Sequence, residues 1–352
     1  MTTDQSKLLQ EQVHHAYENN QPLNIVGGNS KSFYGNNITG EVLKLSDHSG
    51  IVEYEPTELV ITANAGTSLS EINQLLDSKN QMLGFEPPQF SAGATLGGTI
   101  ACNFSGPRRA YAGAARDFLL GCNIINGKAE MLTFGGNVMK NVAGYDVSRL
   151  MAGAMGTLGI ILSCSVKTLP KPEAEMTLSL NCNENEAINT MRNWAQKSLP
   201  ISATCFYGSQ LFARLSGTDK AVKTAFKNIG GEAISNTDLF WQSIKEQQHE
   251  FFLTDKPLWR VSIDATASPL KNKTCLYEWS GALRWFHADE NDTSLIDYAK
   301  SHDGHATLFK GHTQTENVFQ ALPDGLAIIH QNLKKSFDPK GILNHGKLYS
   351  GF

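Results

Sequence analysis

The apolar residues at the start of the chain recur near the 3.6-residue period of a helix, at Leu8, Leu9, Val13 and Ala16. The turn-prone pair Asn19-Asn20 then precedes Pro22, which interrupts helical hydrogen bonding. We therefore expect an amphipathic helix over the first twenty residues. The short apolar run at residues 23–26 predicts a strand that ends in the polar turn 27–31.

Strand and helix patterns follow one another further along the chain. Residues 59–63 predict a strand, and Ser68 with Glu71 has the spacing of a capping box that begins a helix. Two more strands are expected at residues 117–126 and 158–169.

The best candidate for a domain boundary is the Pro-Lys-Pro step at residues 170–172. Beyond it the chain has fewer glycines and more aromatic residues, with alternating strand and helix patterns that are typical of a separate α+β domain. A last helix is predicted from an apolar stripe at Leu326, Ile329, His330, Leu333 and Phe337. Asp338-Pro339 would end it, and a glycine-bounded tail follows at residues 341–347.

Composition narrows the class of protein. The 352 residues are 41% hydrophobic and 18% charged, which suits a globular protein with a sizeable core. A formal net charge of −4 provides no field that attracts nucleic acid or an anionic membrane. The N-terminal stretch lacks the apolar core of a signal peptide and no later stretch resembles a membrane span, so we expect a cytoplasmic protein.

The cysteines do not form a metal-binding pattern. They are scattered at wide intervals, at Cys102, Cys122, Cys164, Cys182, Cys205 and Cys275, without a Cys-x-x-Cys pair. We expect them to be reduced and to pack as small apolar side chains.

Glycine is the more informative residue. About half of the 31 glycines fall between Gly84 and Gly159, and residues 84–107 are expected to form an ordered loop that lines a ligand. Glycine is combined with small polar residues at 26–31, 93–109, 113–117 and 144–159. Backbone N–H groups surround phosphate oxygens best where no Cβ blocks the approach, so the segments together favour a dinucleotide-sized ligand. For any one segment the alternative is a set of tight turns, and neither a Gly-x-Gly-x-x-Gly fingerprint nor a P-loop is present.

Five short motifs in this part of the chain occur in a recognisable order, at residues 26–30 (Val-Gly-Gly-Asn-Ser), 93–99 (Gly-Ala-Thr-Leu-Gly-Gly-Thr), 105–109 (Ser-Gly-Pro-Arg-Arg), 144–150 (Gly-Tyr-Asp-Val-Ser-Arg-Leu) and 156–160 (Gly-Thr-Leu-Gly-Ile). Their order and spacing resemble the FAD-binding half of the vanillyl-alcohol oxidase/PCMH flavoprotein family. Within that family, residues 140–146, 279–285, 305–309 and 337–339 are similar to the E subunits of bacterial glycolate oxidases.

The resemblance implies an α+β fold in which a PCMH-type FAD-binding domain is built from two parts. Residues 1–170 would form the FAD-binding domain and residues 171–315 an α+β cap, or substrate domain, over the flavin. Residues 316–352 would form a helix and a tail that returns to the FAD-binding domain.

The resemblance also assigns cofactor contacts to matching positions. Main-chain donors of Gly27, Gly28, Asn29 and Ser30 would hold the pyrophosphate, and Thr95, Gly97, Gly98, Ser105 and Gly106 would run along the pyrophosphate and flavin. Gly153, Gly156, Gly159 and Ile160 would complete the cleft, and Asn344 would approach the flavin ring from the tail. Members that attach FAD covalently often carry His at the position of Asn29, so we expect noncovalent FAD.

Several cations are candidates for anion binding. Arg108, Arg109 and Arg116 lie in a glycine-rich stretch where they would grip a phosphate or carboxylate, or would pair with Asp117 or Asp146. In the predicted cap, Arg260 and Arg284 stand among aromatic residues and would bind a substrate carboxylate or stack on Trp.

The histidines do not form a complete metal site. His305 and His312 have the separation of the paired metal ligands in the D-2-hydroxy-acid dehydrogenases of the family, but the acidic ligand is missing, so we expect no metal. The candidate catalytic residues are therefore His302 and His305 for proton transfer, together with Arg284.

The resemblance implies an FAD-dependent 2-hydroxy-acid oxidoreductase subunit of a glycolate oxidase-type complex. Its substrate would be a small 2-hydroxy acid, glycolate or alternatively D-lactate, and its partners a related flavin subunit and an iron–sulfur subunit that takes the electrons. Through these partners it would lie at the inner membrane surface. The alternatives are a non-catalytic subunit that carries FAD for electron transfer or assembly, and a stand-alone flavin dehydrogenase for another alcohol.

Overall fold

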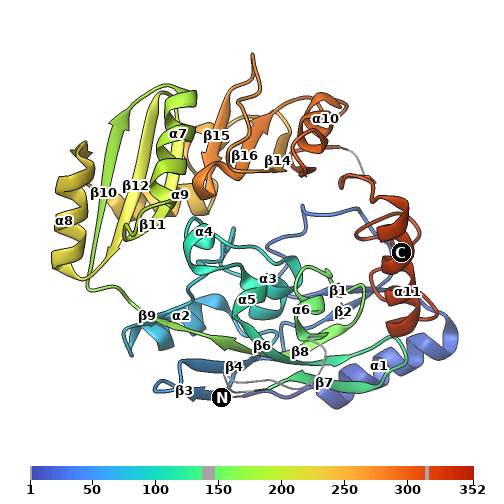
Figure 1. The fold of residues 1–352 in the computed structure, drawn as a ribbon. Helices are drawn as coiled ribbons and strands as arrows, with labels where there is room; N and C mark the ends of the chain where they lie inside the picture. The colour runs from blue at the N-terminus through green and yellow to red at the C-terminus, as the bar shows by residue number, and fades with distance from the viewer. Residues whose placement is uncertain (1, 137–146, 314–316) are drawn as a thin grey trace.

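The computed structural model describes residues 2–136, 147–313 and 317–352, arranged around two β-sheets (Figure 1). The sequence motif at residues 140–146, with Asp146, lies outside the described residues. We call the part built on the smaller sheet the first unit and the part built on the larger sheet the second unit. The expected α+β class is confirmed.

The sheet of the first unit has five antiparallel strands. In spatial order they are β3 (Ile51–Glu55), β4 (Val60–Asn64), β8 (Ile160–Lys167), β6 (Leu119–Ile125) and β7 (Met131–Gly135). The central strands β4 and β8 are apolar or small at nearly every position and are buried along almost their whole length, because both of their faces are covered. Helices pack on this core, namely α1 (Ser6–Asn19), α2 (Leu69–Asp77), α3 (Leu96–Cys102), α5 (Ala115–Phe118) and α6 (Val147–Met151).

Two small strand pairs complete the first unit. The parallel pair consists of β1 (Leu23–Val26) and β2 (Glu41–Lys44), and the antiparallel pair of β5 (Gln81–Met82) and β9 (Leu169–Pro170). The short helix α4 (Arg109–Ala112) lies between the units and contacts the larger sheet.

The sheet of the second unit has eight strands. Their order is β13 (Glu232–Ala233), β10 (Ala174–Asn181), β12 (Gln210–Gly217), β11 (Ile201–Tyr207), β15 (Cys275–Glu278), β16 (Leu283–His287), β14 (Leu258–Ser262) and β17 (His305–Lys310). Three helices cover the face that points away from the first unit, α7 (Glu184–Ala195), α8 (Asp219–Ile229) and α10 (Ser294–Lys300).

The inner face of the larger sheet, which points toward the first unit, packs on aromatic residues. Side chains of a strand alternate between the two faces, so Leu283 and Trp285 point inward while Arg284 and Phe286 point toward the covering helices. The inner core also contains Phe104 of the first unit. It is closed by α9 (Thr237–Lys245) and by the 3₁₀ turns η1 (Glu250–Phe252) and η2 (Trp279–Gly281).

The C-terminal segment returns to the first unit. After α11 (Asp324–Phe337), Ile342 and Leu343 enter the core of the first unit, and Leu343 forms a parallel bridge with Leu23. Leu23 N–H also donates to the carbonyl of Ile342 at 2.7 Å.

The helical prediction for α11 is confirmed, but its expected apolar stripe is not a buried face. Leu326 and Ile329 remain 48% and 54% exposed, whereas Lys334 is buried. The Lys334 ammonium is stable there because it donates to the carbonyl oxygens of Thr157 and Leu343 and to Asp338.

Other expected elements are confirmed with shifted boundaries. The strand predicted at 117–126 begins only at Leu119, because α5 occupies the preceding residues, and the strand predicted at 158–169 is divided into β8 and β9. The ordered loop expected at 84–107 contains α3, a glycine-rich helix that begins after the capping residue Thr95. All six cysteines are free thiols. Within the described part of the chain, no helix combines the length and apolar character needed to cross a membrane.

Candidate functional site

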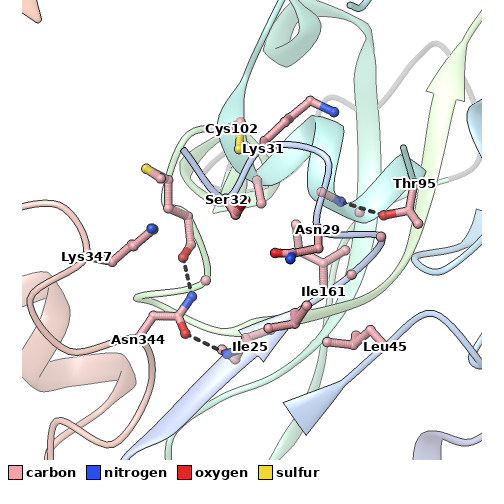
Figure 2. Close-up of a pocket in the computed structure, with 18 of the residues that line it drawn as sticks. Ile25, Asn29, Lys31, Ser32, Leu45, Thr95, Cys102, Ile161, Asn344 and Lys347 are labelled. Atoms are coloured by element: carbon pink, nitrogen blue, oxygen red, sulfur yellow. Dashed lines mark hydrogen bonds between the residues drawn. The ribbon is translucent and has the colours of Figure 1, made fainter. Parts of the chain in front are cut away.

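A pocket of about 310 Å³ lies in the first unit between the loop after β1, the start of α3, the turn before β8 and the C-terminal tail (Figure 2). Its volume falls in the range of small-molecule and cofactor sites. Ten of the fourteen predicted cofactor contacts line it: Gly27, Gly28, Asn29, Ser30, Thr95, Gly97, Gly98, Gly156, Gly159 and Asn344.

The loop at residues 27–31 presents free backbone donors to the pocket. None of its five N–H groups donates a hydrogen bond to a described residue. Asn29 adopts a left-handed conformation with φ of 57°, which Asn tolerates better than most side chains. Successive unpaired N–H groups in such a turn form an anion-binding concavity.

Glycine is required where this loop meets the 93–98 segment. A Cβ on Gly28 would lie 1.4 Å from the carbonyl oxygen of Gly93, so no larger residue fits without separating the two segments. A Cβ on Gly97 would similarly lie 2.6 Å from the Cβ of Ala65. The glycines therefore allow the loops to pack closely and leave their backbone atoms on the pocket wall.

Thr95 fixes the start of α3. Its Oγ1 accepts a hydrogen bond from the N–H of Gly98 at 3.3 Å, as Figure 2 shows. This cap orients the first turn of the helix, with Gly97 and Gly98, toward the pocket.

Asn344 joins the tail to the pocket wall. Its Oδ1 accepts from the N–H of Ile25 at 2.7 Å, and its Nδ2 donates to the carbonyl of Met155 at 2.7 Å. The side chain thus links β1, the turn before β8 and the tail. Its orientation is set by protein contacts on both polar atoms, which makes it a positioning residue for the pocket.

Two lysines that were not predicted from the sequence make the pocket cationic. Lys31 follows the first glycine loop and Lys347 follows Asn344 in the tail. Burial lowers the pKa of both ammonium groups. No Asp or Glu is among the described residues that line the pocket. The Cys102 thiol between them is neutral at physiological pH, since burial raises its pKa to about 11.

The remaining predicted contacts lie elsewhere. Ile160 is buried in the core of the first unit, and its neighbour Ile161 lines the pocket because strand side chains alternate. Ser105 accepts a hydrogen bond from Ala115 N–H, and with Gly106 it lines a second, smaller cavity. Gly153 stands beside Asn103 with a positive φ of 92°, outside the pocket.

The pocket fits a nucleotide diphosphate. Free main-chain donors and two ammonium groups match the negative charge of a pyrophosphate, whereas Ile25, Leu45 and Ile161 supply an apolar wall for a ring system. These features come from the glycine-rich segments predicted to bind phosphate, together with two lysines that were not predicted.

The structure does not place Arg284 at a ligand site. It is 0% exposed on the outer face of the second sheet, where its guanidinium donates to the carbonyls of Gly281 and Ser268 and lies 4.9 Å from the Tyr277 ring. These contacts satisfy the cation within the protein. The suggestion of a catalytic role is therefore replaced by a structural one.

The candidate histidines also lie outside both cavities. His302 follows α10 and its ring bonds to the carbonyl of Tyr298 at 2.9 Å. His305 begins β17, where burial and the nearby cations Arg260 and Arg109 lower its pKa. No group of three or more potential metal ligands occurs among the described residues, and His305 and His312 do not gain a third.

The arginines near residue 110 have separate roles. Arg108 pairs with Glu86 at 3.1 Å and with Glu175 at 2.6 Å, so the expected pairing with Asp117 is wrong for this residue. Arg116 lies 3.8 Å from Asp117, as the sequence suggested. Arg109 lies over the Trp279 ring at 4.3 Å, a contact made between the two units.

Comparison with known proteins supports this description. Residues 3–135 match a family model described as an FAD binding domain. The chain is 43% identical to the glycolate oxidase subunit GlcE of Escherichia coli over 99% of this chain and 98% of that protein. It is 35% identical to the glycolate oxidase subunit GlcD of Bacillus subtilis over 88% of this chain and 80% of that protein. Among solved structures, alkyldihydroxyacetonephosphate synthase has the same fold, with a TM-score of 0.68 at 15% identity over 98% of this chain and 76% of that one.

Proposed function

The chain belongs to the glycolate oxidase GlcE family of FAD-binding flavoproteins, and from this membership we propose that it is the FAD-binding subunit of a complex that oxidises a small 2-hydroxy acid. The product is the corresponding 2-oxo acid, and the electrons pass to a partner subunit. Glycolate is the proposed substrate and D-lactate the second candidate. The resemblance noted in the sequence is confirmed at the level of family.

The observation that carries this proposal is the pocket between the 27–31 loop and the tail. Its unpaired N–H groups and the cations Lys31 and Lys347 suit the pyrophosphate of FAD, and its apolar wall suits a ring. The bound flavin would accept the two electrons that leave the α-carbon of the substrate. The protein binds and orients the cofactor, and Asn29 at the position of the attachment residue is consistent with noncovalent FAD.

We extend the proposal to the domains and the site. Residues 1–170 with the tail 316–352 would act as the FAD-binding domain and residues 171–315 as the cap. The contacts with FAD would come from the predicted residues that line the pocket, with Ile161 in place of the Ile160 side chain and with Lys31 and Lys347 added.

The partners are part of the same proposal. Both glycolate oxidase relatives are described as subunits, which supports a complex with other chains. We propose a related flavin subunit and an iron–sulfur subunit as these chains, because the free cysteines of this chain are dispersed and provide no cluster site of their own. Attachment to the inner membrane would then occur through the partners.

One observation favours an alternative function, that of a subunit that carries FAD without oxidising substrate. His302, His305 and Arg284 line neither the cofactor pocket nor the smaller cavity. If these were the chain's only catalytic groups, it would act in electron transfer or assembly.

An absorption spectrum tests the proposal. The chain is purified alone and with its co-expressed partner subunits, and spectra are recorded before and after anaerobic addition of glycolate or D-lactate. We expect a flavin spectrum that bleaches with substrate, and flavin that is released into the supernatant by acid. Bleaching only in the presence of partners would favour the alternative function, a subunit that carries FAD without oxidising substrate. A colourless protein in every preparation would refute FAD binding.

A further inference from the structure

The second cavity lies between the two units, beside the cofactor pocket. It has a volume of about 40 Å³ and is lined by Asn103 to Gly106 from the first unit and by the inner face of the second sheet. The residue before this segment, Cys102, lines the cofactor pocket. The two spaces therefore adjoin at the end of α3, and the smaller one lies on the side of the second unit.

Arg260 points into this cavity from the centre of β14. It pairs in register with Trp285 and Thr307 on the neighbouring strands, and Leu258 on the same face belongs to the inner core. Its guanidinium makes no hydrogen bond to a described residue and has no described carboxylate within 4.0 Å. Its Cζ lies 5.2 Å from the centre of the Trp279 ring, and Tyr34 and Glu278 interact with its charge.

A partly buried guanidinium without a hydrogen-bond partner is costly, since the charge of Glu278, more than 4.0 Å away, repays its desolvation only in part. Burial lowers the pKa of Arg260, in agreement with this environment. By comparison, Arg284 on the opposite face has its donors satisfied by carbonyl groups. Arg260 therefore has free donors for an anionic ligand.

Glu278, the last residue of β15, also lines the cavity. It is 5% exposed, and one carboxylate oxygen accepts a hydrogen bond from the Trp285 indole at 2.8 Å. The other oxygen has no hydrogen-bond partner among the described residues. Burial raises the pKa of Glu278 to about 7, which brings its proton exchange into the physiological range.

The size of the cavity limits the ligand. A volume of about 40 Å³ is much smaller than that of the cofactor pocket, so a two- or three-carbon acid fits better than a longer one. Phe104, Trp279, Trp285 and Phe309 form apolar walls of the cavity. Surroundings of low dielectric constant strengthen the attraction between a carboxylate and Arg260.

We propose that this cavity is the 2-hydroxy-acid site, in which Arg260 binds the substrate carboxylate and Glu278 is the catalytic base that accepts the hydroxyl proton. This inference rests on the proposed function, because it assigns the substrate of that same reaction. It also supplies a base that the histidines do not.

The step balances with FAD as the two-electron acceptor. The hydroxyl O–H bond breaks and its proton moves to the free oxygen of Glu278. The Cα–H bond breaks with its electron pair, which leaves with the hydrogen as a hydride equivalent for the flavin, and a carbonyl double bond forms at Cα. Glu278 then returns its proton to solvent.

Calorimetric titration with oxalate, a two-carbon dicarboxylate that cannot be oxidised in this way, tests the binding part in the full-length chain. We expect oxalate to bind the wild type and Arg260→Gln to weaken its affinity at least tenfold, with partial recovery in Arg260→Lys. Arg192→Gln, on the exposed surface of α7, is the matched control and should bind as the wild type. Equal affinity in the wild type and Arg260→Gln would overturn the assignment of Arg260.

The base is tested by the rate of anaerobic flavin reduction by glycolate across pH. In the wild type the rate should rise as Glu278 loses its proton near pH 7, in a field set by Arg260, Lys245 and Glu86. Glu278→Gln should still bind oxalate. Its flavin should be reduced by glycolate about 10²- to 10⁴-fold more slowly than in the wild type, and the rise of the rate near pH 7 should be lost. Glu232 is exposed, and the control variant Glu232→Gln should keep the wild-type rate of flavin reduction and its pH dependence.

The outcomes separate this inference from the function on which it rests. If glycolate and D-lactate reduce the wild type and Glu278→Gln equally fast, Glu278 is not the base although the proposed function stands. If neither acid reduces the wild type with its partners present, the catalytic function fails. In that case a weaker affinity of Arg260→Gln for oxalate would still identify the cavity as an acid site, and wild-type affinity would show that it is not one. Circular dichroism and FAD content show that each variant is folded.

Discussion

Glu86 of the first unit binds Arg214 of the second unit through two hydrogen bonds. Nη2 of Arg214 lies 2.8 and 2.9 Å from the two carboxylate oxygens, and Arg108 donates to the same carboxylate at 3.1 Å. Glu175 completes the network by pairing with Arg108 at 2.6 Å. The largely buried pair fixes the orientation of β12 relative to the loop of Glu86, and thereby the position of the second unit over the first.

Loss of the Glu86 carboxylate should destabilise the protein. Glu86→Gln leaves the guanidinium groups of Arg108 and Arg214 close together with Glu175 as their remaining carboxylate partner. Removal of one partner from a buried ion pair costs about 3–5 kcal/mol. We expect Tm to fall by about 5 °C or more in a thermal scan. Glu58 is an exposed residue of the same unit, and the control variant Glu58→Gln, which makes the same change of carboxylate to carboxamide, should leave Tm unchanged. Equal Tm values for the two variants would contradict a role for Glu86 between the units.

The same network predicts a pH dependence of stability. Burial raises the pKa of Glu86, but Arg214 and Arg108 outweigh this effect and hold the pKa below its ordinary value. The stabilisation is therefore present above the pKa of the unfolded chain, about 4.3, and is lost as pH falls through the folded pKa. The difference in Tm between the wild type and Glu86→Gln should stay the same in scans from pH 7 to pH 5 and should narrow as the pH falls below about 4.3. A constant difference would show that ionisation of Glu86 is not involved.

Gly28→Ala should abolish cofactor retention. The new Cβ would overlap the carbonyl oxygen of Gly93, 1.4 Å away, and would force apart the loops that carry the free N–H groups. We expect purified Gly28→Ala to lack flavin absorbance. Gly325→Ala is the control, because no atom lies within 4 Å of its Cβ position, and it should retain flavin with Tm unchanged or slightly raised. A yellow Gly28→Ala protein would show that the loops separate without harm to the pocket.

Asn344→Ala should weaken FAD binding about 10- to 100-fold. The substitution removes both side-chain hydrogen bonds and leaves Ile25 N–H and the Met155 carbonyl unpaired, at about 1–3 kcal/mol each. Titration of the apoprotein with FAD measures the dissociation constant. Asn332→Ala on the exposed side of α11 is the control and should bind as the wild type. Unchanged affinity in Asn344→Ala would mean that the tail does not position the pocket.

Arg284→Lys should affect stability and not ligand binding. Lysine cannot replace the donors that reach the carbonyls of Gly281 and Ser268, so we expect a lower Tm. The folded fraction should bind oxalate with wild-type affinity because this side chain lies on the outer face. A selective loss of oxalate binding at unchanged Tm would restore a role for Arg284 at the site.

The sequence by itself was sufficient for features that depend on near neighbours. Helical periodicity predicted α1 and α11, and the Ser68 cap is confirmed by its hydrogen bond from Glu71 N–H at 3.1 Å. Glycines within one short loop similarly indicated a phosphate site, because freedom from a Cβ is a local property. The order of these motifs was specific enough to identify the family.

Tertiary structure alone decided which side chains share a site. Strand pairing and the choice of inner face place Arg260 and Glu278 at one cavity, and they turn Arg284 outward. Ile25 and Asn344 meet only because the tail returns across most of the chain. A one-residue change of register would move every side chain of a strand to the opposite face of the sheet. In strands buried on both faces, the apolar pattern does not show which face meets the other unit. Local sequence therefore determined the elements and the cofactor loop, whereas long-range packing determined the site between the units.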